Sequence, residues 1–220
     1  MESLTLQFTL QSAATFGRGD GVAGLVDEEI EHDADGLPYL RGRTLKGLLA
    51  EECANVLYAL ELQGKADRWR DLAYAMFGRP GSLLADTGTL RVGDARLPVE
   101  LRQALKAIVA RNEVTIDEVL AALTSIRRQT SLNEYGGPEY GSLRSMRVIL
   151  PGTTFEAALE FSSKPDTKAL SLLAACVLAW RRAGINRNRG RGRLVASLFD
   201  SQRNDITAAL FLPFAREVMP

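Results

Sequence analysis

The sequence predicts an α+β fold with the ferredoxin-like βαββαβ order, and three observations support it. Apolar residues alternate along the first segment, which is typical of a half-buried strand. Two long amphipathic segments, residues 43–62 and 167–182, have the spacing of helices. Each is followed by a strand-like segment, which gives the order strand, helix, strand, strand, helix, strand. We expect these strands over residues 4–10, 88–94, 154–161 and 194–199.

The first two elements have distinct signatures. Residues 4–10 place Leu4, Leu6, Phe8 and Leu10 on one face of a strand. The helix that follows has Thr44 as its expected N-cap and an apolar stripe formed by Leu45, Leu48, Leu49 and Cys53. Between them, residues 17–35 are rich in glycine and acid and are expected to form a loop or an irregular strand.

Further elements are inserted between these core segments. A short helix over residues 66–77 is expected to end at Gly78, with Pro80 beyond it. Residues 98–110 and 115–124 predict a pair of helices, and the glycines of 136–141 mark a turn between two extended arms. We therefore expect one domain over residues 1–220, with a helical insertion at about 98–125 and a hairpin at 130–147.

Composition excludes several classes of protein. The 220 residues carry no formal net charge, so any polyanion must be attracted by local patches. Cys53 and Cys176 lie among aliphatic residues and predict buried free thiols in a reducing cytoplasm. Two separated cysteines and one histidine disfavour a zinc site. We find neither a signal peptide nor an apolar run long enough to span a membrane, so we expect a cytoplasmic protein.

The charges are nevertheless separated along the chain. Six acidic side chains crowd residues 27–35, whereas residues 184–193 carry four arginines and no acid. In an extended backbone, Arg187, Arg189, Arg191 and Arg193 would project from one side about 6.6 Å apart. Such a comb would bind successive phosphates, while the glycines between the arginines would let another backbone come close. The alternative is a solvated edge strand whose arginines pair with surface carboxylates.

A second basic segment lies at the start of the first long helix. Arg41, Arg43, Thr44 and Lys46 surround a helix N-terminus, where unpaired amide hydrogens favour an anion. We expect this segment to form a second wall of the same phosphate track, although basic residues at helix starts are usually only solvated.

The acidic run has two interpretations. Such a run is usually a solvated face. Alternatively, one aspartate assists attack on a phosphodiester, either by orienting a divalent cation or by acid–base chemistry. His32 is a conceivable general base, but a lone histidine is more often incidental.

Residues 125–147 predict a protruding hairpin. Arg127, Arg128 and Arg144 lie at its roots, and Tyr135 and Tyr140 lie near its tip. We interpret it as a contact for nucleic acid or for another subunit. An ordinary surface hairpin is the alternative.

Five segments together resemble the RAMP superfamily, and most closely the repeated backbone subunit of type III CRISPR effector complexes. The resemblance follows the order of the chain over most of its length, and the segment at 37–47 combined with a late glycine-rich loop is specific to the family. The segments are LPYLRGRTLKG (37–47), AMFGRPG (75–81), TGTLRVGDARL (87–97), TSLNEYGGPEYGSLRSMRVILPGTTF (130–155) and AGINRNRGRGRL (183–194).

The resemblance implies an RRM-like core packed along a CRISPR guide RNA, with residues 132–143 as a thumb that bends the guide. In members that cut target RNA, a loop aspartate acts with a divalent cation, Mg²⁺ or Mn²⁺. Asp27 and Asp33 have the family's spacing, which gives Asp27 the catalytic and metal-binding role and makes Asp33 the second carboxylate. The family's small residue, proline and valine after the first aspartate are replaced here by Glu28, Glu29 and Ile30.

The resemblance also implies the partners: guide RNA, target RNA, neighbouring copies or related backbone subunits, and other effector subunits. Arg41, Thr44, Lys46 and the arginines of 187–193 would contact guide phosphates. Two other functions stay open. One is a non-catalytic scaffold that binds guide RNA, and the other is a guide-processing ribonuclease, which the single histidine and the single core disfavour.

Overall fold

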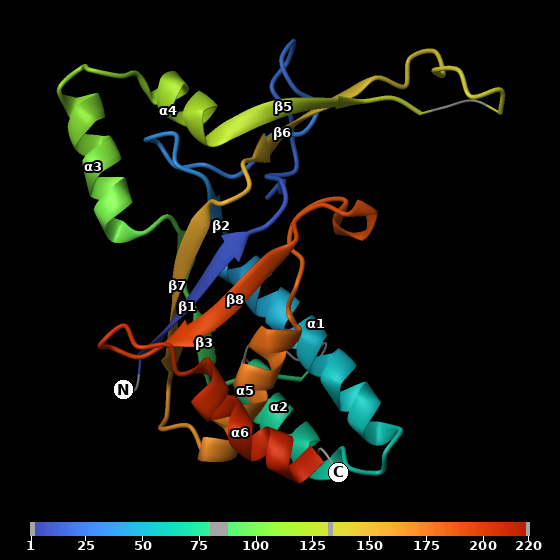
Figure 1. The fold of residues 1–220 in the computed structure, drawn as a ribbon, viewed down its shortest axis with the longest axis vertical. Coiled ribbons are helices and arrows are strands. Elements are labelled where there is room, and N and C mark those ends of the chain that lie inside the picture. Colours follow the sequence, from blue (N-terminus) through green and yellow to red (C-terminus); the bar gives the residue numbers. More distant parts are fainter. Residues whose placement is uncertain (1–2, 80–87, 132–133, 219–220) are drawn as a thin grey trace.

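The computed structural model describes residues 3–79, 88–131 and 134–218, and its centre is an antiparallel sheet (Figure 1). The strands pair in the order β2-β4-β7-β1-β8, and β3 also pairs with β7. The strands of this sheet are β1 (Ser3–Leu10), β2 (Tyr39–Leu40), β3 (Leu90–Val92), β4 (Ala95–Arg96), β7 (Thr154–Phe161) and β8 (Leu194–Phe199). The described helices are α1 (Gly42–Glu61), α2 (Asp67–Phe77), α3 (Val99–Ala110), α4 (Ile116–Leu123), α5 (Thr167–Ala179) and α6 (Thr207–Val218).

The pairing confirms the α+β class. β1 and β3 are both antiparallel to β7, which lies between them, so β1, α1 and β3 form a split βαβ unit. In the same way β7, α5 and β8 form a second unit around β1. The bounds predicted for β7 and β8 match the structure, and β1 begins one residue earlier than predicted.

The core lies between the sheet and the helices on one of its faces. Leu4, Leu6, Phe8 and Leu10 are buried, as the alternation predicts. Phe8 stacks on Phe155, with ring centroids 5.2 Å apart, and meets Trp180 edge-on at 4.9 Å. Burying one such side chain contributes roughly 1.5–3 kcal/mol, so this aromatic cluster fixes α5 against the middle of the sheet.

The start of α1 differs from the prediction. The helix begins at Gly42, with Arg41 at the N-cap, and Thr44 lies inside the first turn. The Gly42 amide donates to the Asp94 carboxylate over 2.9 Å. This hydrogen bond holds the pKa of Asp94 below its ordinary value. A side chain 52 residues away therefore caps the helix, which local sequence could not reveal.

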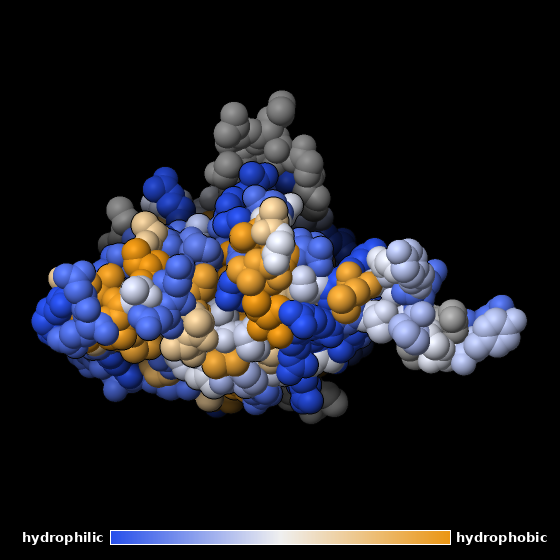
Figure 2. All heavy atoms as spheres, turned by 90° about the horizontal axis from the view of Figure 1, so that it is seen from above, coloured by the Kyte–Doolittle hydropathy of each residue, from blue (hydrophilic) through white to orange (hydrophobic). Residues whose placement is uncertain are grey.

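The helical insertion and the hairpin lie at one end of the sheet (Figure 1). α4 begins at a capping box formed by Thr115 and Glu118. α3 has no fully buried residue, and seen from above, apolar side chains gather over α3 and α4 (Figure 2). Val99, Leu101 and Ile116 belong to this partly exposed apolar surface.

The predicted hairpin forms a separate two-stranded sheet of β5 (Thr124–Gln129) and β6 (Arg144–Ile149). It projects from the body of the molecule (Figure 1). The acidic loop lies along the other edge of β6, where Glu28 bridges to Met146. Of the segment proposed as the thumb, Leu132 lies outside the described residues.

Two other expectations can be compared with the structure. α5 ends at Ala179 rather than near residue 182, because the backbone turns extended at Trp180. Cys53 and Cys176 are buried free thiols, as predicted, and burial raises the pKa of Cys176 well above its ordinary value. Within the described part of the chain, no helix combines the length and apolarity that a membrane crossing requires.

Candidate nucleic-acid interface

The glycine-rich loop is folded rather than extended. Residues Arg187–Arg189 form one turn of 3-10 helix, flanked by Asn186 and Gly190 in the left-handed region. The prediction of an in-line comb of arginines is therefore wrong. Gly192 explains the loop's position, because a Cβ there would lie 1.8 Å from the carbonyl oxygen of Ala183. The predicted close approach is thus found at Gly192 but not at Gly190, which faces open space.

This folded loop separates two cavities. The larger, which we call the polar cleft, has a volume of about 830 Å³, and the smaller, the apolar pocket, about 210 Å³. Asn186 and Arg189 face the polar cleft, Arg187 faces the apolar pocket, and Ile185 borders both.

Three segments that are far apart in the sequence meet at the polar cleft. The acidic loop contributes Asp27 and Glu28, and the hairpin contributes Gln129 and Arg144 among others. Arg189 closes the cleft from the glycine-rich loop. The acidic, hairpin and arginine segments singled out from the sequence are therefore neighbours in space.

Several arginines near this cleft form no ion pair within the part of the chain that the structure describes. The guanidinium of Arg191 lies against the sulfur of Met146. Burial lowers the pKa of Arg191, as do the charges of Arg127 and Arg189, so these arginines are close together. Among the described residues, six arginines of the hairpin and the loop take part in no ion pair: Arg127, Arg128, Arg144, Arg189, Arg191 and Arg193. Such a cluster attracts a polyanion even on a chain without net charge.

Asp27 is held as an ionised carboxylate at the edge of this cluster. Its Oδ2 accepts hydrogen bonds from the Ser145 amide at 2.6 Å and the Ser145 hydroxyl at 3.0 Å. These bonds, followed by the charge of Arg144, hold the pKa of Asp27 below its ordinary value. Asp27 therefore suits the roles of cation ligand or hydrogen-bond acceptor better than that of proton donor.

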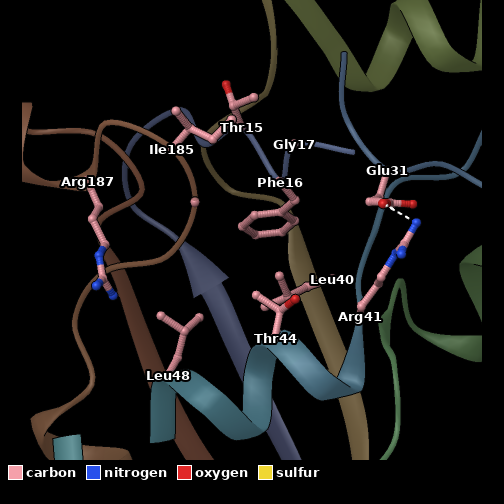
Figure 3. Close-up of a pocket in the computed structure, with 11 residues that line it drawn as sticks. Thr15, Phe16, Gly17, Glu31, Leu40, Arg41, Thr44, Leu48, Ile185 and Arg187 are labelled. Carbon is pink, nitrogen blue, oxygen red and sulfur yellow. Dashed lines mark ion pairs between the residues drawn. The ribbon is translucent and has the colours of Figure 1, made fainter. Parts of the chain in front are cut away.

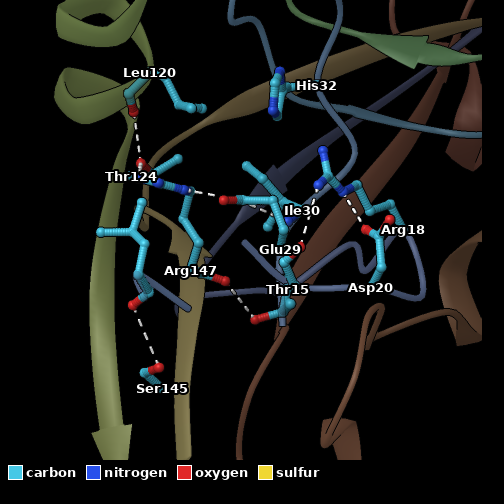
Figure 4. Close-up of polar contacts among 12 residues, drawn as sticks. Thr15, Arg18, Asp20, Glu29, Ile30, His32, Leu120, Thr124, Ser145 and Arg147 are labelled. Carbon is cyan, nitrogen blue, oxygen red and sulfur yellow. Dashed lines mark hydrogen bonds and ion pairs between the residues drawn. The ribbon is translucent and has the colours of Figure 1, made fainter. Parts of the chain in front are cut away.

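The acidic run is not a solvated face. Glu29 is 1% exposed and accepts from Arg147 Nε over 2.8 Å. Arg147 also donates to the hydroxyl of Thr124, and its carbonyl accepts from Thr15 (Figure 4). This buried network ties the acidic loop to β5, β6 and the segment after β1, which fixes the backbone two residues from Asp27.

Asp33 and His32 do not line the polar cleft. Oδ1 of Asp33 accepts from the amides of Asp35 and Leu37, both at 3.1 Å, and its Oδ2 pairs with Arg96 at 3.5 Å. His32 Nδ1 lies 3.1 Å from the carbonyl oxygen of Asp33. In this structure Asp33 closes a turn, and the two predicted catalytic aspartates are not brought together.

The start of α1 does lie beside the glycine-rich loop, but at the apolar pocket instead of the polar cleft, and its charges differ from the expectation. Arg41 pairs with Glu31 at 2.5 Å, and Arg187 pairs with Glu51 at 2.8 Å. Lys46 is half-buried and donates to the Leu90 carbonyl at 2.8 Å, so it is not a mobile charge facing either cavity. Burial lowers its pKa. The start of α1 and the glycine-rich loop thus face one apolar pocket whose rim charges are compensated.

The remaining predicted contacts lie on the surface. Arg43 and Thr44 are exposed in the first turn of α1, and Thr44 borders the apolar pocket. Tyr135 and Tyr140 are 88% and 104% exposed near the hairpin tip. Sequence reasoning missed Ser145 and Ile185, because their roles depend on strand register and on the fold of the loop.

The carboxylates of the polar cleft could bind a cation only together with phosphates of a bound RNA. Among the described residues, no group of three or more histidine, cysteine, aspartate or glutamate side chains could hold a metal ion. Mg²⁺, however, is commonly bound by one or two carboxylates together with substrate phosphates. Asp27 and Glu28, which share the polar cleft, fit that mode.

Comparisons with known proteins agree with this fold. The family model described as the RAMP superfamily matches residues 7–195. A chain of the cryo-EM structure of type III-B Cmr-beta bound to cognate target RNA aligns with a TM-score of 0.63 at 14% identity, covering 90% of this chain and 97% of that one. A chain of the apo state of type III-B Cmr-beta aligns with a TM-score of 0.61 at 15% identity, with the same coverage. No curated protein matches the sequence. At these identities the structural likeness concerns the fold.

Proposed function

Because the chain belongs to the RAMP superfamily, we propose that it is a backbone subunit of a type III CRISPR ribonucleoprotein. In this proposal it binds guide RNA and cleaves complementary target RNA by metal-dependent endoribonuclease action. The observation that carries the proposal is the polar cleft, where unpaired arginines gather around one ionised aspartate.

RNA binding is supported by charge and shape together. Arg127, Arg144, Arg189 and Arg191 come from two segments that converge on the cleft, and among the described residues they take part in no ion pair. Guanidinium groups bind phosphates in a bidentate manner, and such contacts do not depend on sequence. A subunit that holds the guide by its backbone leaves target recognition to base pairing, as in other RNA-guided systems.

Cleavage is assigned to Asp27. RNA supplies its own nucleophile, the 2′-hydroxyl, so few protein groups are needed. A Mg²⁺ or Mn²⁺ ion, when bound, would neutralise charge that develops on the scissile phosphate. Asp27, with Glu28 beside it, would hold that ion. Ser145 fixes one oxygen of Asp27 through two hydrogen bonds and keeps the carboxylate ionised.

One observation favours the scaffold alternative. Among the described residues that line the polar cleft, Asp27 and Glu28 are the only carboxylates, and no histidine joins them. A subunit with this cleft could bind RNA without cutting it. The proposed partners are the same in both cases: guide RNA, target RNA, neighbouring backbone subunits and other effector subunits.

Salt-dependent RNA binding tests the shared part of the proposal. Arg144→Gln and Arg189→Gln are each expected to lower the slope of log affinity against log salt by about 0.7, the value for one phosphate contact on a single strand. Arg203→Gln, which removes an arginine paired with Glu100 elsewhere, serves as the control. Unchanged slopes in the first two variants would exclude the polar cleft as the RNA site.

Cleavage by the assembled complex separates enzyme from scaffold. Asp27→Ala is expected to leave guide binding intact and to reduce magnesium-dependent cutting of a complementary RNA by roughly 100-fold or more, because the charge stabilisation that a held metal ion supplies is worth several kcal/mol. Asp35→Ala, in the same loop but paired with Lys106, is the matched control. Full activity of Asp27→Ala would leave the scaffold role for this subunit. Loss of activity in Asp33→Ala without loss of folding would give Asp33 a catalytic share.

A further inference from the structure

The apolar pocket differs from the polar cleft in what it can accept. Phe16, Leu40, Leu48 and Ile185 supply its apolar lining, and they come from four different segments (Figure 3). Its volume of about 210 Å³ is below the ~300 Å³ at which pockets for drug-sized ligands begin. The pocket therefore suits one small group rather than a whole nucleotide.

The rim of the pocket disfavours an anion. Arg41 and Arg187 stand on opposite sides of it (Figure 3), and each is already paired with a carboxylate, Glu31 or Glu51. Glu31 is largely buried and lines the pocket itself. A phosphate here would lie near that carboxylate and would compete for arginines that are already neutralised. An uncharged ligand meets neither obstacle.

The pocket also lies next to the proposed phosphate site. Ile185 borders both cavities, so a strand that follows the polar cleft passes the mouth of the apolar pocket. Proteins that bind single-stranded RNA commonly splay bases out and bury them against aromatic, aliphatic or guanidinium surfaces. The hydroxyl of Thr44 at the rim can donate or accept a hydrogen bond at a base edge.

We propose that the apolar pocket receives a single nucleobase, turned out of an RNA strand whose phosphates lie in the polar cleft. The identity of the strand rests on the proposed function, but the chemistry of the pocket does not. Arg41 and Arg187, each held in place by its glutamate, would then lie on either side of the base and would not bind phosphate.

Uncharged nucleosides test the pocket without any RNA strand. In the full chain with labelled methyl groups, adenosine or cytidine should shift the NMR signals of Leu40, Leu48 and Ile185 more than other methyl signals. Leu48→Trp fills the pocket and should abolish these shifts, whereas Leu57→Trp, at a similarly half-buried site further along α1, should keep them. If Leu48→Trp does not fold, Thr44→Trp fills the pocket from an exposed position. Absence of shifts up to the solubility limit of both nucleosides would overturn the proposal.

An RNA experiment distinguishes a base from a phosphate. One abasic nucleotide is placed at successive positions of a short single-stranded RNA, and binding is measured by fluorescence anisotropy. At one position the wild-type chain should lose roughly 5- to 100-fold in affinity, the effect of one buried or stacked base. Leu48→Trp should remove that loss and leave the salt slope unchanged. A lower salt slope in Leu48→Trp would identify a phosphate site and reject the nucleobase.

The two experiments distinguish an error in the nucleobase pocket from an error in the proposed function. Methyl shifts with nucleosides in a chain that binds no RNA would reject the proposed function and keep the nucleobase pocket. Tight RNA binding without methyl shifts, and with equal abasic losses in the wild type and Leu48→Trp, would reject the pocket and keep the proposed function.

Discussion

Replacing Arg147 by methionine should strongly destabilise the fold, because it leaves the buried Glu29 carboxylate without its partner. Glu29 is 1% exposed and Arg147 is 9% exposed, so water cannot take over the role of the missing partner. Removing one member of such a buried pair typically costs about 3–5 kcal/mol, because the other charge remains buried and uncompensated. The hydrogen bond from Arg147 to Thr124 is lost as well. This is a large part of the 5–15 kcal/mol stability of an ordinary domain.

Equilibrium unfolding of the full chain in urea measures this cost. Arg128→Met is the matched control, because Arg128 is an exposed arginine of β5, two residues beyond the cross-strand partner of Arg147, and forms no ion pair among the described residues. Its effect should stay within about 0.5 kcal/mol. The double variant Arg147→Met with Glu29→Met removes both charges and should recover at least half of the loss. A cost below about 1 kcal/mol for Arg147→Met, or no recovery in the double variant, would refute the reasoning.

Three further predictions concern glycines and the Asp27 carboxylate. Gly192→Ala should prevent the glycine-rich loop from packing, because its Cβ would collide with the Ala183 carbonyl; Gly190→Ala, facing open space, should lower the melting temperature less. Gly47→Ala should raise the free energy of unfolding by about 0.5–1 kcal/mol, since Gly47 is exposed within α1 and a Cβ there meets nothing within 4 Å. Ser145→Ala should move the NMR titration of Asp27 to higher pH. The lowered pKa makes Asp27 stabilising above its ordinary pKa, and that contribution is lost as pH falls through the lowered value. Because Ser145→Ala removes the hydroxyl hydrogen bond but keeps the one from the Ser145 amide, the pKa of Asp27 should rise only part of the way toward its ordinary value. An unmoved titration would contradict the share of the lowered pKa that is assigned to the hydroxyl.

The periodicity of apolar residues predicted the strands that bury one whole face in the core. β7 and β8 were predicted with the bounds found, because alternation along a half-buried strand is a local property of the sequence. β2 and β4 were missed, since two residues show no period and such strands exist only through their pairing. α6 was not predicted either, and it contains Pro213 within its span.

The candidate site was predictable in composition but not in geometry. The acidic and arginine-rich segments do converge, as their chemistry suggested, and the hairpin joins them, which the sequence did not predict. The conformation of the loop could not be read from the spacing of its arginines, because Asn186 and Gly190 adopt left-handed backbone and end the extended run. The sequence also could not show which arginines form ion pairs. Arg41 and Arg187 pair with carboxylates of other segments, Glu31 and Glu51.

The buried pair also explains the departure from the family pattern in the acidic loop. The resemblance implies a small residue, proline and valine after the loop aspartate, where this chain has Glu28, Glu29 and Ile30. Glu29 is the counter-charge of Arg147, so the glutamate and the arginine stabilise the structure only together. A relative with an apolar residue at the position of Glu29 should therefore lack an arginine at the position of Arg147, because that arginine would be buried without a partner. Relatives that keep the arginine beside an apolar residue would show that another group can neutralise it. The extra acid in this loop would then need a functional explanation instead of a structural one.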